Sequence, residues 1–208
     1  ASMEEVMMAI PNYYEEISNE ENTFSTTNVT NNYALELLQV QEAWQNYTSG
    51  SSNVKVGVID TGVNSSSYLS SNLVPGYNVV TLNNVTTDTD GHGTAVASVI
   101  GGSTTGVCNN VSIVPIKIIE QEAEQSTTSA VYKRRALQYA NEHHIPIVNL
   151  SYACHSQYVN LYAGLDVDIS NYDGLVVLAA GNYTMDVDDP NQAFTLYPTA
   201  YDCENMIT

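Results

Sequence analysis

The sequence is short of positive charge and of long apolar runs. Five Lys and Arg residues stand against 23 Asp and Glu residues, which gives a formal net charge of −18. A field of that sign repels phosphate backbones and argues against nucleic acid as a partner. No apolar stretch approaches the roughly 20 residues of a membrane-spanning helix, so we expect no membrane span. The acidic, ordinary globular composition favours a secreted or cell-surface protein.

Three of the five cations stand together, at Lys133, Arg134 and Arg135. Because they fall within a segment with helical spacing of apolar residues, we expect them to form the solvated face of a helix.

Cysteine is also scarce. Cys108, Cys154 and Cys203 are an odd number at unrelated spacings, with no C-x-x-C pair. This argues against a metal cluster and against a full disulfide framework. One disulfide with one free thiol, or three buried thiols, both remain open. A dinucleotide-binding domain is excluded as well, because no G-x-G-x-x-G follows an expected strand.

From residue 33 onward, segments with helical and strand periodicity alternate. We expect strands near 54–59, 77–81, 112–119, 145–150 and 174–180, and helices near 34–44, 127–143 and 158–171, with a further helix opening near residue 92. Alternation of this kind predicts an α/β fold with a mostly parallel twisted sheet flanked by helices. The apolar segment 205–208 stops as though inside another strand, so we expect the fold to be incomplete in this chain.

Three polar residues stand where such a sheet places its chemistry. Asp60 ends the β-branched run 54–59, and Asn182 follows the run 174–181. Since the carboxyl ends of parallel strands form one rim, we expect the two side chains to lie near each other. His92 opens a helix between two glycines, which let the backbone turn tightly and leave the ring uncrowded.

The runs around these residues resemble the motifs of the subtilisin-like serine proteases, the subtilases. Val-Ile-Asp-Thr-Gly at 58–62 is similar to their aspartate motif, and His-Gly-Thr-Ala-Val-Ala at 92–97 to their histidine motif. Val-Val-Leu-Ala-Ala-Gly-Asn at 176–182 resembles the strand that carries their oxyanion asparagine. The order Asp before His is also that of the family. The resemblance runs from about residue 33 to residue 208, and implies the subtilisin-like fold.

The resemblance implies a role for each residue. His92 would take the proton from a serine hydroxyl, and Asp60 would orient the imidazole and stabilise its charged form. Asn182 would donate a hydrogen bond to the oxyanion. Peptide substrate would be bound by the segments around Ser151, Tyr152, Ala153, Ala180 and Gly181. The resemblance also implies that residues 33–208 form the N-terminal portion of a catalytic domain, and that residues 1–32 are an N-terminal extension or a propeptide remnant.

One motif of the family is missing. The nucleophile sequence Gly-Thr-Ser-x-Ala occurs nowhere in the 208 residues, and only 26 residues follow Asn182. We expect the catalytic serine on a separate C-terminal fragment or second polypeptide, so this chain alone should be inactive. The alternative is a non-catalytic module that holds extended peptides without cutting them. No cofactor is predicted; the family allows calcium, but we assign no residue to it.

Overall fold

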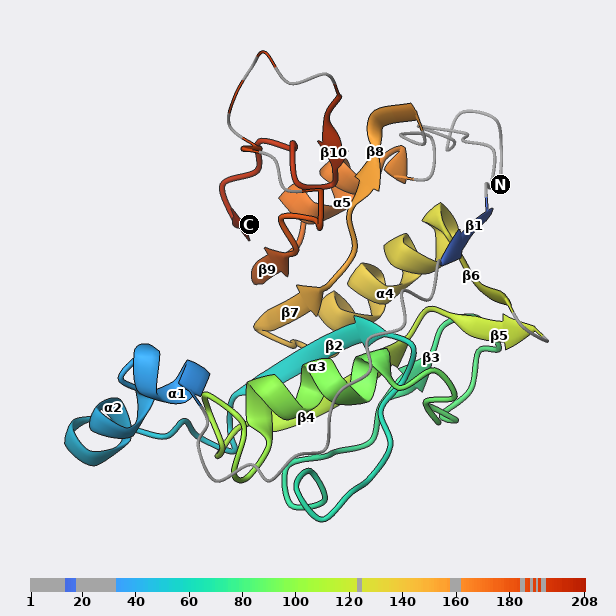
Figure 1. Ribbon diagram of the computed structural model, residues 1–208. Helices are drawn as coiled ribbons and strands as arrows, with labels where there is room; N and C mark the ends of the chain where they lie inside the picture. The colour runs from blue at the N-terminus through green and yellow to red at the C-terminus, as the bar shows by residue number, and fades with distance from the viewer. Residues whose placement is uncertain are drawn as a thin grey trace.

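The computed structural model describes residues 14–17, 33–122, 125–157, 162–183, 186–187, 189, 191 and 194–208. A six-stranded sheet forms its centre, in the order β11-β9-β7-β2-β4-β3 (Figure 1). These strands are β2 Lys55–Asp60, β3 Tyr77–Asn78, β4 Ser112–Lys117, β7 Ile147–Leu150, β9 Leu175–Leu178 and β11 Met206–Ile207. Every pairing between them is parallel. This confirms the predicted α/β fold.

Helices cover both faces of this sheet, as Figure 1 shows for α3 and α4. The helices are α1 Tyr33–Leu37, α2 Val40–Asn46, α3 His92–Gly101, α4 Ala130–Glu142 and α5 Leu165–Ser170. Side chains alternate along a strand, so Val56 and Val58 of β2 point to one face and pack with Ala97 of α3. Ile59 points to the other face, into a core shared with Leu137 of α4 and Leu165 of α5. Burial on both faces explains why residues 56–59 of β2 carry no polar side chain.

Two small antiparallel sheets accompany the central one. The first has the order β1-β6-β5, in which β1 is Tyr14–Ile17, β6 is Gln125–Ser129 and β5 is Glu120–Glu122. The second pairs β8 (Cys154–His155) with β10 (Leu196–Tyr197).

The expected helix 34–44 is wrong as one element. It divides into α1 and α2 at Gln39, whose φ of 55° lies in the left-handed region. After this break, the indole of Trp44 donates a hydrogen bond to the carbonyl of Val107 at 2.8 Å. Leu37 and Leu38 remain exposed, although their spacing had placed them on an apolar helix face.

The expected helix 127–143 begins three residues later than predicted. Residues 127–129 belong to β6, and the hydroxyl of Ser129 accepts a hydrogen bond from the Tyr132 amide at 3.4 Å, as an N-cap does. The Thr-Thr-Ser run at these positions suits a strand better than a helix, because β-branched side chains lose freedom in a helix.

The expectation of a solvated basic face on α4 holds for Arg135, which is exposed, but is wrong for Lys133. Lys133 is buried, with its ammonium 3.9 Å from the ring centroid of Tyr162. Arg134 pairs with Asp168 of α5, and Arg135 donates to the carbonyl of Val79 at 3.4 Å. The three cations therefore join α4 to its neighbours, because the stem of a long side chain can pack while its charge finds a partner.

The other boundaries differ by a few residues from those expected. The expected helix 158–171 is observed as α5, with residues 158–161 outside the described part. The expected strand 77–81 shortens to β3, and segment 205–208 contributes β11 at the edge of the sheet. None of the described helices has both the length and the apolar character of a membrane span.

Candidate active site

The carboxylate of Asp60 lies at the end of β2, on the face of the sheet that α3 covers. Alternation along the strand places it there, because Asp60 follows Val56 and Val58 in steps of two. The residue is fully buried. Its Oδ1 accepts a hydrogen bond from the Thr61 amide at 2.7 Å, whereas Oδ2 finds no hydrogen-bond donor among the described residues.

His92 is the first residue of α3 and faces this carboxylate. Its Nδ1 lies 2.8 Å from Asp60 Oδ1, and its side chain is 42% exposed whereas that of Asp60 is 0% exposed. Gly91 has a φ of 106°, which glycine adopts without a steric penalty. A Cβ on Gly93 would lie 2.2 Å from the carbonyl oxygen of Gly62. The start of the helix therefore packs directly against the turn that follows the strand.

The contact between the two residues shows in the proton affinity of the imidazole. The hydrogen bond with Asp60 raises the pKa of His92 above its ordinary value of 6.5. Burial of the ring acts in the opposite direction, and the negative charges of Asp60, Asp90 and Asp88 support the rise. An imidazole with a raised pKa that is still accessible to solvent is suited to accept and return a proton near neutral pH.

A second segment reaches the same rim from β7, which pairs with β2 in parallel. Ser151, Tyr152 and Ala153 follow the end of this strand and are half-buried. The ring centroid of Tyr152 lies 6.2 Å from that of His92, and the side-chain amide of Asn149 donates to Ser151 Oγ at 2.7 Å. The structure thus brings the expected substrate-binding segment beside the imidazole.

A third segment follows β9, which pairs with β7 in parallel. Gly181 has a φ of 91° there, and a Cβ on it would lie 3.6 Å from Ala153 Cβ and 2.6 Å from Leu196 Cδ1. The segment with Ala180 and Asn182 therefore lies against the residues that follow β7. Asn182 is exposed at the rim where β2, β7 and β9 all end.

A buried acid that the sequence analysis missed holds the loop before α3. Asp88 Oδ1 accepts hydrogen bonds from the Thr61 hydroxyl at 2.8 Å, the Gly91 amide at 2.8 Å and the Asp90 amide at 3.1 Å. Its Oδ2 accepts from the amide and the hydroxyl of Thr94, at 2.9 and 2.5 Å. Burial alone would raise the pKa of Asp88, but these bonds outweigh it and hold the pKa below 3.8.

One signal in the sequence could have indicated Asp88. An acid shortly before the first residue of a helix can accept from the amides that no helical carbonyl satisfies. Asp88 stands four residues before His92, and Asp90 stands two before it. The sequence alone does not show which of the two is buried: Asp88 is 4% exposed, whereas Asp90 is partly exposed.

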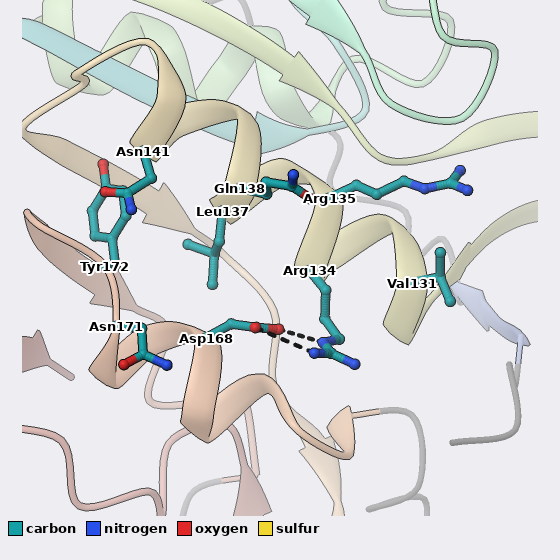
Figure 2. Close-up of a pocket in the computed structure, with 9 residues that line it drawn as sticks. All are labelled: Val131, Arg134, Arg135, Leu137, Gln138, Asn141, Asp168, Asn171 and Tyr172. Atoms are coloured by element: carbon teal, nitrogen blue, oxygen red, sulfur yellow. Dashed lines mark hydrogen bonds and ion pairs between the residues drawn. The ribbon is translucent and has the colours of Figure 1, made fainter. Parts of the chain in front are cut away.

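A separate cavity of about 350 Å³ lies between α4 and α5 (Figure 2). Figure 2 shows the guanidinium of Arg134 paired with the carboxylate of Asp168, with Asn141, Asn171 and Tyr172 at the other end. None of the residues that line it belongs to the rim described above, so the cavity is separate from the candidate active site.

None of the three cysteines forms a disulfide, and each is half-buried. Neither alternative left open by the sequence describes them fully, because no disulfide forms and no thiol is fully enclosed. Within the described ranges, no group of three or more His, Cys, Asp or Glu residues is placed to hold a metal ion.

A mostly parallel sheet covered on both faces, with an Asp–His pair where the strands end, defines a hydrolase-like α/β site. Comparison with known families agrees with this geometry. Residues 51–208 match the family model of the peptidase S8 group, the subtilase family. The chain belongs to the subtilase family of serine peptidases.

Individual relatives extend the comparison. Subtilisin DY of Bacillus licheniformis is 30% identical over 82% of this chain and 61% of its own length. The extracellular serine proteinase of Thermus sp. (strain Rt41A) is 29% identical over 67% of this chain and 34% of its own length. The chain thus spans about 61% of the first of these relatives and a smaller share of the second.

Solved structures show the same fold. MycP1 without its N-terminal propeptide superposes with a TM-score of 0.62 at 26% identity, over 82% of this chain and 60% of its own. A mutant of the epidermin leader peptide processing protease of Staphylococcus aureus reaches a TM-score of 0.72 at 17% identity, over 93% of this chain and 54% of its own. At that identity, the second match supports the fold alone.

Proposed function

We propose that this chain carries the acid, base and oxyanion parts of a serine endopeptidase. In this proposal His92 Nε2 takes the proton of a serine hydroxyl as that oxygen attacks the scissile carbonyl, and then returns it to the leaving amine. Asp60 keeps the Nδ1–H tautomer in place through the 2.8 Å contact. That contact lies at the rim of the sheet beside the proposed substrate-binding segments, and it is the observation on which the proposal rests.

Asn182 is proposed as the oxyanion donor. It is exposed beside Ala180 and Gly181, where a side-chain amide can reach negative charge that develops on the carbonyl oxygen. Ser151, Tyr152 and Ala153 face this position across the rim and are proposed to hold the extended peptide. Ser151 is not proposed as the nucleophile, because it is assigned here to substrate binding and its Oγ accepts a hydrogen bond from the Asn149 side-chain amide.

The nucleophile is proposed to lie on a segment that these 208 residues do not contain. The absence of a Gly-Thr-Ser sequence and the partial coverage of Subtilisin DY support this. The partners are then that segment and a peptide or protein substrate, and the chain by itself would not hydrolyse peptides. Secretion is proposed from the acidic composition and from relatives described as extracellular, such as the minor extracellular protease Epr of Bacillus subtilis.

Labelling with a fluorophosphonate tests this function, because the reagent reacts with an activated serine hydroxyl. We expect the full protein to be labelled and to hydrolyse casein, and His92→Ala to abolish both. Asn182→Ala should lower kcat by about 10²–10³, the loss found for the oxyanion amide of subtilisin itself. Asn171→Ala is the matched control, because Asn171 is exposed beside the α4–α5 cavity.

Two results would contradict the proposal. If the full protein is neither labelled nor active but still binds peptides, it is a peptide-binding module instead. If this chain alone, without any added segment, hydrolyses casein and is labelled, the nucleophile lies within it, and its place must be sought by mapping the labelled peptide.

A further inference from the structure

The loop that precedes His92 is attached to the turn after Asp60 from two directions. From one side, the five hydrogen bonds accepted by Asp88 join Thr61 to the first turn of α3. From the other, the buried ammonium of Lys117 donates to the carbonyls of Thr61 at 2.7 Å and Thr87 at 3.0 Å. Asp88 and Lys117 therefore both connect the turn at Thr61 to the loop before α3, Lys117 at residue 87 and Asp88 at residue 88.

Thr61 is the residue through which this attachment reaches the helix. Its hydroxyl donates to Asp88 Oδ1 at 2.8 Å and accepts from the Gly93 amide at 2.9 Å. Its own amide donates to Asp60 Oδ1, the oxygen that also contacts His92. A continuous series of hydrogen bonds thus runs from Asp88 through Thr61 to the carboxylate and the imidazole.

We propose that Asp88 is a positioning residue for the candidate active site: by fixing the loop 88–94 on Thr61, it sets the distance and angle between the His92 imidazole and Asp60. Asp88 does not touch the imidazole. Its effect passes through the backbone of Gly91 and Thr94, which it holds on either side of the first helical residue. The role of this placement in catalysis rests on the function proposed above. The placement itself can be tested without an activity assay.

An amide cannot replace the carboxylate at this position. Both oxygens of Asp88 accept from donors, and Oδ2 accepts from two groups of Thr94. In Asp88→Asn, one oxygen becomes an NH2 group that faces a donor, so either the Thr94 amide or the donors at Oδ1 lose their acceptor. At Asp90, Oδ1 accepts a 3.2 Å bond from the His92 amide, and the oxygen of an asparagine at this position can keep that bond.

Other charges around the imidazole must be separated from this effect. The carboxylates that act on His92 are Asp60 on β2 and Asp88 and Asp90 in the preceding loop. On the neighbouring strand β4, Lys117 is the register partner of Asp60 and lies on the same face. From the segment after β7, the tilted ring of Tyr152 faces the imidazole. Asp90→Asn removes one negative charge from this set, as Asp88→Asn does, and is therefore the control for the loss of one charge.

The test is the pKa of His92 measured by NMR of the imidazole C–H in this chain, with the signal assigned through His92→Gln. We expect Asp88→Asn to lower that pKa clearly further than Asp90→Asn, because it loosens the Asp60 contact as well as removing a charge. Thr61→Val should lower the pKa in the same direction with no change of charge, and Thr61→Ser should restore it. The Thr61 pair decides the question if Asp88→Asn does not fold.

Equal effects of Asp88→Asn and Asp90→Asn, together with no effect of Thr61→Val, would overturn the positioning role. In the full protein, we expect Asp88→Asn to lower kcat about 10- to 100-fold with little change in KM, since a displacement of about 1 Å can cost that much. If the full protein proves inactive while the pKa result holds, the proposed function fails and the positioning role of Asp88 stands.

Discussion

At the scale of single residues, the burial of Asp60 decides the behaviour of the site. A fully buried carboxylate needs a donor or a positive partner, because burial of an isolated charge is costly. The Thr61 amide and the His92 ring both lie against one oxygen, at 2.7 and 2.8 Å, and Oδ2 is left without a donor among the described residues. The carboxylate therefore depends on the imidazole, and its negative charge in turn favours the protonated form of that ring.

Asp60→Asn should lower the pKa of His92 below the value that His92 has in the unmodified chain. The hydrogen bond with the carboxylate is the largest cause of the raised value, and once it is gone the burial of the ring, which opposes protonation, prevails. An NMR titration of the imidazole measures this. An unchanged pKa in the variant would mean that the contact contributes nothing to proton affinity.

The same contact makes stability depend on pH. Since the folded pKa of His92 lies above its unfolded value of about 6.5, its contribution is fully present below pH 6.5 and is lost as the pH rises through the folded pKa. In the active protein the dependence has the opposite sign, because a base must be neutral to accept a proton. We expect kcat/KM to rise with pH through that raised pKa.

At the scale of the element, α3 approaches the sheet through a face of small residues. Gly93, Ala97 and Gly101 are its buried residues, and their spacing of four places them on one side. A Cβ on Gly101 would lie 2.9 Å from Ile113 Cδ1. This close approach brings the N-terminus of the helix to the end of β2, so it is a condition for the contact between Asp60 and the imidazole.

Gly93→Ala should force the helix away from the strand. The new Cβ would stand 2.2 Å from the carbonyl oxygen of Gly62 and 3.1 Å from Asp60 Oδ1, and backbone oxygens cannot move aside cheaply. We expect a loss of about 1–3 kcal/mol of unfolding free energy in urea. Val99→Ala, on the exposed side of the same helix, should change it by less than about 0.5 kcal/mol. Equal losses would show that the close approach is not required.

At the scale of the whole molecule, the net charge of −18 is the dominant property. Like charges repel one another across a folded surface, and salt screens that repulsion over about 10 Å at 0.1 M. Three of the five cations make internal contacts: Lys117 and Lys133 are buried, and Arg134 pairs with a carboxylate of α5. Lys55 and Arg135 are exposed, and their two positive charges offset little of the acidic surface.

Raising the NaCl concentration from about 0.02 to 0.3 M should therefore raise the Tm of this chain. The measurement is a thermal scan at neutral pH, with sucrose or glycerol at matched osmolality to separate screening from exclusion effects. A Tm that falls with salt would show that attractive pairs such as Arg134–Asp168, which salt weakens, outweigh the general repulsion.

The sequence by itself predicted the parallel sheet and the pair of residues, Asp60 and His92, that the structure brings into contact. Asp60 and His92 could be identified because strand ends in an α/β fold share one rim, and local rules of burial and helix initiation place a side chain at that rim. The position of Asn182 followed from the same rule. Strand periodicity and the residue type at a strand end or helix start are local features of the sequence, so they can be predicted without the tertiary structure, although the contact itself joins residues 32 positions apart.

Only the tertiary structure decided the rest. Asp88, Lys117 and the buried Lys133 acquire their partners from residues between 6 and 56 positions away, and no local pattern distinguishes them from exposed charges. The break at Gln39 and the strand that replaces the first turn of the helix expected at 127–143 have the same origin. In each case packing against a distant segment outweighs a local preference of less than about 1 kcal/mol per residue.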